Sequence, residues 1–503
     1  MKNRPVRTVL FMTGLTVLAK ALGLARSLLF SAAYGAGEEA AAFLAALSVP
    51  LTLFDLLLSA AVPGCFIPYY RDTEDGREAA RFAAGFFTVT AAVCALFSAA
   101  GVLFGPLLIP LAAPGLSETG RALAAGPVRV LFLSLPFIGG TAVLSALHQA
   151  KGNYLLPAGI SLLSNLLLSV WLAFFDRGNV LLLSFLFLAS WGLQFLTALV
   201  PFLGHPLPKP SFRADERMKS AFSSFLPVTL GAWLLPAGAF LGTHFSSALD
   251  PAGNVRFDCA YQIFLLTGGV LVFSLSQYLF PKLTGKGEQP AVLLETGILS
   301  VLSLTLPTGF LLSALSGEVV SVLFRHGAFT APDAEAAGAI LKLLALFLPF
   351  FSLNELLSKA FYAAKKPLIP LSAALLGVGT DLFFSMLAKD PPAAGAALGA
   401  GLTVSSAFLL LSLGKLPVPP PKKTAYGVLF LSAAALPLLP AAEKLRGLTG
   451  NIPQTAGTLR NLTTCAQTAL PLLLLYACLL FAAFRLMKRV KAKKSEHNRG
   501  ESD

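Results

Sequence analysis

Residues 153–175 read NYLLPAGISLLSNLLLSVWLAFF and contain no acidic or basic side chain. A run of this kind matches the roughly 20 apolar residues that a helix needs to cross the hydrocarbon core of a bilayer. Comparable runs lie at 290–315 and 463–484. Over all 503 residues only 13% are charged, about half the roughly 25% that is typical of soluble domains. Lipid, rather than water, is therefore the solvent for most of this chain.

The same runs predict helices rather than strands. Within lipid, backbone groups must satisfy their own hydrogen bonds, which leaves helices or closed barrels. Barrel strands would alternate apolar and polar residues over about 10 positions, whereas these runs are rich in Leu, Ala and Phe without alternation. We therefore predict an all-α polytopic membrane protein with about fourteen spans. They lie near 7–31, 38–66, 82–113, 122–148, 153–175, 180–203, 220–246, 257–281, 290–315, 335–363, 367–388, 393–414, 424–441 and 463–484.

Three short sequence matches indicate an internal repeat. The two members of each pair are separated by about 214 residues, the length of six predicted spans. An even number of spans gives both copies the same orientation, which implies parallel lobes related by an axis along the membrane normal. The matches are Phe30-Ser-Ala-Ala33 with Phe245-Ser-Ser-Ala248, Phe66-Ile-Pro68 with Leu279-Phe-Pro281, and Ala150-Lys151 with Ala364-Lys365.

The repeat predicts three parts: a six-helix lobe at 1–204, a second one at 205–414, and two additional helices with a basic tail at 415–503. Two such lobes can rock against each other around a central cavity, which is the geometry of alternating access. Lys and Arg favour one set of loops by roughly three to one, and the positive-inside rule then places both termini in the cytoplasm. We interpret the net charge of +13 as this orientation signal and expect no nucleic-acid partner.

Two cations within the first span are the strongest candidates for chemistry. Charged side chains at membrane depth are costly, so their presence indicates a functional site. Lys20 and Arg26 are separated by about 120° around a helix and can face one broad cavity. One interpretation is an ion pair with Asp55 in the second span. The other is a phosphate or pyrophosphate on a substrate, for which Lys and Arg are natural donors.

The other charges within spans leave alternatives open. Glu355 and Lys359 have the favourable i,i+4 order of a helix ion pair, and could otherwise form an ion-coupling site. Asp381 is more isolated and could be a proton or cation site, or the partner of Lys342 or Lys359. Arg129 either extends the basic surface of the first span or lies near the membrane interface with its charge in water.

The sequence contains no recognisable catalytic constellation. It has no HExxH, GxSxG, P-loop or aspartate-rich metal motif. The five cysteines have neither metal-ligand nor disulfide spacing. We therefore expect a transporter rather than an enzyme, without a cofactor, driven by the membrane potential or by a monovalent cation.

Three stretches carry a resemblance to a known family. The first is Lys20-Ala-Leu-Gly-Leu-Ala-Arg26 with Tyr34-Gly-Ala-Gly37, the second is Ala42-Phe43 through Pro50 to Phe66-Ile-Pro68, and the third is residues 322–333, VLFRHGAFTAPD, with Ala360-Phe-Tyr-Ala-Ala364. They resemble the MurJ (MviN) family, the lipid II flippases of peptidoglycan synthesis. That family belongs to a superfamily, called MOP, which also contains multidrug (MATE) and polysaccharide exporters.

The resemblance implies that spans 1, 2, 7 and 8 line a cationic cavity for a pyrophosphate-sugar head group. It also implies that spans 13 and 14 form a groove for the polyprenyl tail. Lys20 and Arg26 match cavity positions of the family. Asp55 follows the position of a frequent arginine in span 2. In span 8 the frequent arginine falls at Tyr261, with Arg256 five residues earlier, so these three are further candidate substrate-binding residues.

The expected function is that of a flippase in a bacterial inner membrane. Its substrate would be lipid II or a related polyprenyl-diphosphate glycolipid, moved from the inner to the outer leaflet, and cell-wall synthesis proteins are further candidate partners. The alternatives are an exporter of another polyprenyl-linked glycan, an ion-coupled drug antiporter of the same superfamily, and a non-transporting scaffold. A drug antiporter would use cavity carboxylates such as Asp55 or Asp381, and the cations of span 1 disfavour cationic drugs.

Overall fold

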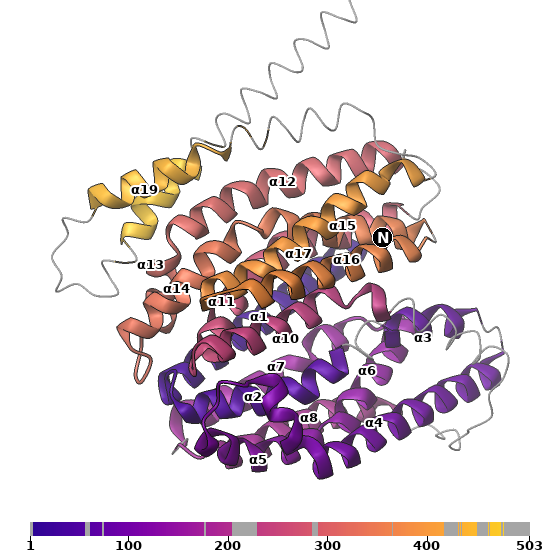
Figure 1. The fold of residues 1–503 in the computed structure, drawn as a ribbon. Helices are drawn as coiled ribbons and strands as arrows, with labels where there is room; N and C mark the ends of the chain where they lie inside the picture. Colours follow the sequence, from indigo (N-terminus) through magenta and orange to yellow (C-terminus); the bar gives the residue numbers. More distant parts are fainter. Residues whose placement is uncertain are drawn as a thin grey trace, which may run out of the picture.

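The computed structural model describes most of the chain, and Figure 1 shows it as a bundle of helices. The described residues are 4–55, 61–72, 75–175, 178–203, 229–283, 290–364, 366–416, 435–449 and 463–473, with the single positions 431, 433, 461 and 476. No strand occurs among them. Eight of the described helices are long and apolar enough to cross a membrane, or nine if one bent pair counts as a single span. The predicted all-α membrane fold is thus confirmed, while the number fourteen stays a prediction.

The first lobe packs mainly around an apolar core that is rich in Ala and Phe, with a second, smaller apolar cluster. Its long helices run up and down, and two of the passes are each divided into two helices. The elements are α1 (Arg4–Tyr34), α2 (Glu38–Phe54), α3 (Ala61–Arg71), α4 (Gly76–Ala112), α5 (Glu118–Phe132), α6 (Leu135–Ala150), α7 (Leu155–Phe174), α8 (Val180–Leu199) and η2 (Val200–Phe202).

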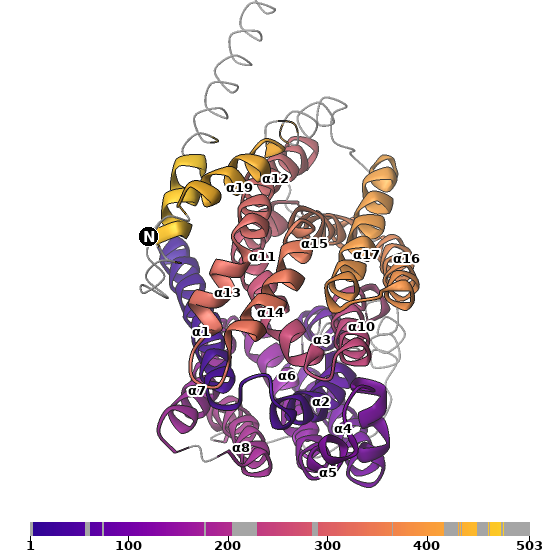
Figure 2. The ribbon, with the colours of Figure 1, turned by 60° about the vertical axis from the view of Figure 1, so that its left-hand side comes forward.

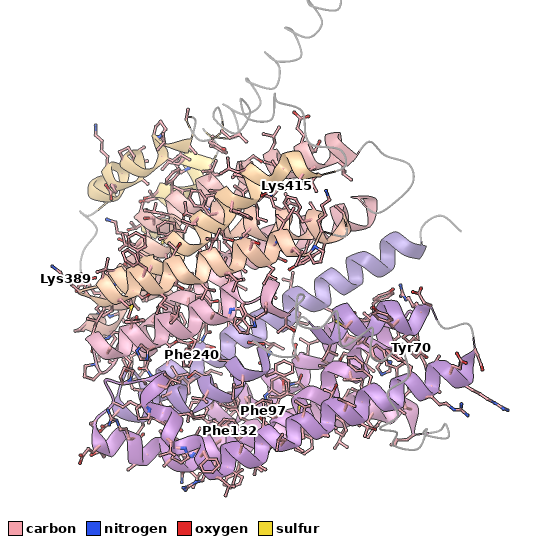
Figure 3. All side chains as sticks on the ribbon, turned by 45° about the vertical axis from the view of Figure 1, so that its right-hand side comes forward. Tyr70, Phe97, Phe132, Phe240, Lys389 and Lys415 are labelled. Atoms are coloured by element: carbon pink, nitrogen blue, oxygen red, sulfur yellow. The ribbon has the colours of Figure 1, made fainter. Side chains whose placement is uncertain are left out.

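The second lobe also combines long and divided helices, and its buried residues form two further apolar clusters. Its elements are α10 (Leu234–Leu249), α11 (Gly253–Leu283), α12 (Pro290–Ala314), α13 (Ser316–Phe324), α14 (Ala331–Ala345), α15 (Leu348–Ala363), α16 (Leu368–Leu387), α17 (Pro391–Leu411) and η3 (Ser412–Lys415). Figure 3 places Lys389 and Lys415 at opposite ends of this lobe, just before α17 and just after it. The lobe boundaries predicted at 204/205 and 414/415 lie in or next to undescribed residues and stay predictions.

The same three residues divide a span in each lobe. Leu135-Pro136-Phe137 begins α6 and Leu348-Pro349-Phe350 begins α15. Proline has no N–H to continue the preceding helix but fits the first turn of a new one. The chain therefore starts a new helix at both positions, and it bends by 51° between α14 and α15. The predicted spans 122–148 and 335–363 therefore each contain two helices instead of one.

The lobes touch at one end of the molecule, which we call the joined end and define by residues 31–41, 111–116, 244–259 and 325–333. There the Ala328 amide donates to the Ala32 carbonyl at 2.8 Å. The side chain of Asn254 donates to the Ala41 carbonyl at 2.9 Å, and His244 Nδ1 lies 2.7 Å from the Leu111 carbonyl. Figure 2 shows α1 running beside α7 of its own lobe and close to α13 of the other.

Two glycines make the close approach at the joined end possible. Gly35 and Gly327 have φ values of +63° and +58°, a region that only glycine adopts without strain. A Cβ on Gly35 would lie 2.5 Å from the Ala328 carbonyl oxygen, and one on Gly327 would lie 2.2 Å from that of Ala32. Main chain therefore packs directly on main chain between the lobes.

The C-terminal part departs from the prediction. The predicted spans 424–441 and 463–484 leave 442–462 as a polar connection, but α19 (Leu438–Thr449) continues as helix through the first part of this segment. Ala, Glu, Lys, Leu and Arg, which dominate this stretch, all favour helix. Ala442 is buried while Glu443 is exposed and pairs with Lys342 of α14 at 3.2 Å. The predicted spans 424–441 and 463–484, and the groove between them, lie largely outside the described residues.

Candidate functional site

A cavity of about 730 Å³ lies between α1, α2, α7 and α8. Lys20 and Arg26 both line it, so the structure brings the two sequence-predicted cations into one space. The Lys20 ammonium lies against Gly269 of α11, where an added Cβ would be 3.4 Å away. The opposite wall is polar: it carries the hydroxyls of Ser161, Ser164 and Ser190, the amides of Asn165 and Gln194, and the indole of Trp191.

The Arg26 guanidinium is held in place from two sides. Its Nη1 donates to Asn165 Oδ1 at 3.2 Å, and Asn165 in turn donates to the Ala19 carbonyl at 3.3 Å. The guanidinium also lies 5.4 Å from the centre of the Phe187 ring, a favourable cation–π arrangement. These contacts orient Arg26 toward the cavity and leave further N–H groups for an anionic ligand.

The carboxylate that faces Arg26 is Asp258, which the sequence analysis missed. Both residues line a smaller cavity of about 170 Å³, and each contributes to the electrostatic environment of the other. Gln262 Nε2 donates to Asp258 Oδ2 at 2.5 Å. Asp55, the partner considered from the sequence, lies at the exposed C-terminal end of α2 and lines neither cavity. The signal for Asp258 was present, since it is a charged residue inside a predicted span.

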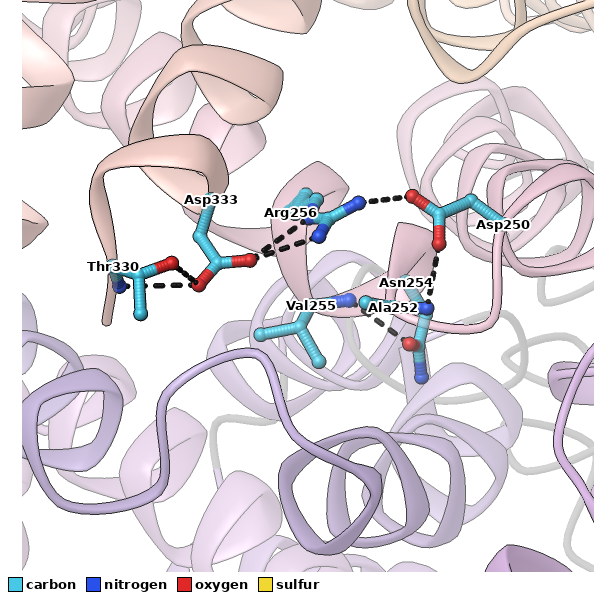
Figure 4. A network of polar contacts seen from close by, with 7 residues as sticks. All are labelled: Asp250, Ala252, Asn254, Val255, Arg256, Thr330 and Asp333. Atoms are coloured by element: carbon cyan, nitrogen blue, oxygen red, sulfur yellow. Dashed lines mark hydrogen bonds and ion pairs between the residues drawn. The ribbon is translucent and has the colours of Figure 1, made fainter. Parts of the chain in front are cut away.

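Arg256 belongs to a salt-bridge network at the joined end and not to either cavity (Figure 4). Its guanidinium contacts Asp250 and lies 2.8 Å from Asp333 Oδ1. The other Asp333 oxygen accepts bonds from the Thr330 amide and hydroxyl, which caps α14. In this conformation Arg256 contacts the residue that caps the start of α14, and its assignment to the substrate stays a prediction.

Tyr261 packs among aromatic rings, stacked on Phe257 at 5.6 Å and close to Phe264. It lines neither cavity, although the carboxylates of Asp55, Asp258 and Asp381 all act on it electrostatically. The α11 residues that line the smaller cavity are Val255, Asp258, Cys259 and Gln262. The assignment of Tyr261 to the substrate therefore stays a prediction.

Asp381 in α16 has no exposed surface. Its Oδ1 accepts from Ser385 at 3.1 Å, and its Oδ2 has no hydrogen-bond partner among the described residues. The cationic partners considered from the sequence are bound elsewhere: Lys342 to Glu443, and Lys359 to Glu355 at 2.6 Å. Among the described residues there is no group of three or more His, Cys, Asp or Glu that could hold a metal ion.

Two repeated helical lobes that are joined at one end, with a cation-lined cavity between helices of the first lobe, define the class of multi-pass membrane transporters. Similarity to known proteins narrows this further. The sequence model of the family described as "Lipid II flippase MurJ" matches residues 30–442. The chain therefore belongs to the MurJ family.

Individual relatives agree with this assignment. A "Probable lipid II flippase MurJ" from Thermotoga maritima is 27% identical over 411 residues, which is 81% of this chain and 84% of the relative. A "Lipid II flippase MurJ" from Burkholderia cenocepacia is 25% identical over 433 residues, 81% of this chain and 83% of the relative.

Solved structures show the same fold. A structure titled "Lipid II flippase MurJ, inward closed conformation" superposes with a TM-score of 0.81 at 19% identity, covering 94% of this chain and 99% of the other. An inward-facing multidrug resistance MATE transporter of the MOP superfamily gives a TM-score of 0.64 at 14% identity, covering 84% and 98%. The expected relation to both families is thus confirmed at the level of fold.

Proposed function

We propose that this protein moves lipid II from the inner to the outer leaflet of a bacterial inner membrane by alternating access. The observation that carries the proposal is the presence of Lys20 and Arg26 in one cavity between helices of a two-lobed transporter fold. Family membership supports the same substrate, because the matching family is described as "Lipid II flippase MurJ". The diphosphate of lipid II would bind these two cations through charge-assisted hydrogen bonds.

The remaining cavity wall suits a head group rich in hydroxyl groups. Ser190, Trp191 and Gln194 follow each other along one face of α8, and Ser161 and Ser164 along α7. Gln194 donates to Ser164 at 3.0 Å, which leaves its carbonyl oxygen available to accept from a ligand. Such a wall can bond sugar hydroxyls while the indole ring covers apolar C–H groups.

The proposed orientation of the protein in the membrane follows from its basic loops. The positive-inside rule puts the N-terminus and the loops rich in Lys and Arg in the cytoplasm, so that the joined end faces outward. The described conformation then has its lobes in contact on the outside. A substrate would enter from the cytoplasmic side with its tail in lipid, and the lobes would then separate at the joined end and release the head group outward.

The function is tested by replacing a bacterium's own lipid II flippase with this protein. Growth on depletion, together with lipid II exposed at the outer surface of spheroplasts, is the expected result. If membrane-inserted protein at normal levels restores neither in a closely related host, the proposal fails. Drug resistance in the same cells, without exposed lipid II, would instead support ion-coupled drug export.

Asp381 is our proposed coupling site for a proton or monovalent cation. A fully buried carboxylate with one unpartnered oxygen is costly, and a bound cation or proton would remove that cost. Asp381→Asn keeps the size and the Ser385 contact, and we expect it to lower flipping about tenfold, equivalent to about 1.4 kcal/mol, and to remove its dependence on a cation gradient. Rates are measured in proteoliposomes with imposed gradients. Thr380→Ala, at a half-buried neighbouring position, serves as the control, and retained gradient dependence in Asp381→Asn would contradict the assignment.

Glu355 and Lys359 are expected to be a structural pair rather than a second coupling site. They lie on successive turns of α15 and are partly exposed, where such a pair contributes only about 0.2–0.5 kcal/mol. The double variant Glu355→Gln/Lys359→Gln should therefore flip within about twofold of wild type, which corresponds to roughly 0.4 kcal/mol. Loss of the gradient response in this variant would assign coupling to α15 instead.

A further inference from the structure

Arg26 and Asp258 face each other across the boundary between the lobes. Arg26 is on α1 of the first lobe and Asp258 on α11 of the second. Five residues beyond Arg26, the Ser31 hydroxyl lies 3.6 Å from the sulfur of Cys259, the neighbour of Asp258 in sequence. The two charges thus lie just on the cavity side of the place where the lobes touch.

The two cavities meet at the same residue. Arg26 lines both of them, together with Leu47, Leu51 and Phe187, whereas Asp258 lines only the smaller one. The first-lobe contacts of Arg26 are to Asn165, through one N–H, and to the face of Phe187. The second lobe contributes the opposite charge, and Gln262 holds it by its side-chain amide.

We infer that Asp258 is a counter-ion that the substrate's diphosphate displaces, and that this exchange couples loading of the cavity to separation of the lobes. In the empty protein, attraction between Arg26 and Asp258 holds α1 and α11 together beside the Ser31–Cys259 contact. A diphosphate that binds Arg26 replaces Asp258 as the anion that attracts the guanidinium. It also carries more negative charge than the carboxylate. Asp258 then faces an anion, and the force across the boundary changes from attraction to repulsion.

The inference rests on the proposed function, since it needs a diphosphate in the cavity. It assigns Asp258 as a positioning residue that acts through Arg26. Removing its charge should let a diphosphate bind without competition, yet should uncouple binding from opening. If Asp258 only supported the fold, its replacement would not change the affinity for the diphosphate independently of the separation of the lobes.

The test uses full-length protein carrying Ser31→Cys, in which oxidative cross-linking to Cys259 reports contact at the joined end. The ligand is a polyprenyl diphosphate without sugars, and its Kd is measured alongside the cross-linking rate. With Asp258 present, saturating ligand should slow cross-linking at least threefold. With Asp258→Asn, ligand should bind three- to tenfold more tightly and leave the cross-linking rate unchanged. Asp258→Glu should restore the ligand response, and Glu335→Gln, an exposed carboxylate on α14, should behave like the parent.

Two results would overturn the inference and are distinguishable from each other. If ligand binds equally well to the parent and to the Asp258→Asn variant, and slows cross-linking equally in both, coupling does not pass through this residue, and the proposed function stands. If the parent protein does not bind polyprenyl diphosphate at all, the proposed function fails and the inference fails with it.

Discussion

Replacing Arg26 by alanine is expected to reduce lipid II flipping to background while the protein still folds and inserts. Removing one member of a desolvated charge pair costs about 2–5 kcal/mol, which corresponds to roughly 30-fold or more in binding. The free energy of unfolding decreases less than the free energy of binding, because the contacts of Arg26 within its own lobe are one hydrogen bond to Asn165 and the Phe187 ring. Lysine at this position should retain a fraction of activity, since it keeps the charge but loses the paired donors of the guanidinium.

The measurement compares the rate at which lipid II appears at the outer leaflet, at matched levels of membrane-inserted protein. Arg129→Ala is the matched control: it also removes a cation from a helix of the first lobe, but Arg129 is exposed and lines neither cavity. We expect the control to remain within about twofold of wild type, as for a surface charge. Normal flipping by Arg26→Ala would refute the assignment of the cavity to the diphosphate.

A disulfide between Ser31→Cys and Cys259 should stop flipping completely and reversibly. The Ser31 oxygen and the Cys259 sulfur are already 3.6 Å apart, so a small side-chain rotation brings two sulfurs to the bonding distance of about 2.0 Å. The bond would tie α1 of one lobe to α11 of the other and prevent separation at the joined end. Reduction should restore the original rate.

Intact-mass analysis of the oxidised protein gives the cross-linked fraction, and flipping should fall in proportion to it. The matched control adds Cys259→Ala to Ser31→Cys, which leaves the new thiol and removes its partner. That protein should be insensitive to oxidant despite the other cysteines, of which Cys65 and Cys94 are buried. Full activity in a fully cross-linked protein would show that the lobes need not part at this place.

The sequence predicted most helices because hydropathy and loop charge report directly on the lipid environment. It did not predict the breaks in the divided spans, although the proline of Leu135-Pro136-Phe137 and its repeat at Leu348-Pro349-Phe350 marked them. It also placed a polar connection where α19 forms, because charged residues in 442–449 outweighed their helix propensity. Hydropathy thus located segments better than it located their interruptions.

The sequence predicted the site residues that stand out within a single helix, but it did not predict the contacts between helices. Lys20 and Arg26 stood out because cations are rare in an apolar run. The engagement of Arg256 could not be foreseen, since its partner Asp333 is 77 positions away in sequence and the contact exists only in three dimensions. Asp258 was detectable by the rule that identified Lys20, but the resemblance directed attention to Tyr261 instead.

Three of the contacts across the joined end have a chemical property that sets them apart from the salt bridges beside them. The bonds from Ala328, Asn254 and His244 all end on main-chain carbonyl oxygens, and none of these acceptors ionises. Dissolved salt screens the interactions between exposed charges but has little effect on hydrogen bonds to neutral groups such as these. If this end faces outward, the contacts that close the protein on that side end on peptide carbonyl groups, whose strength as acceptors varies little with the salinity of the surroundings.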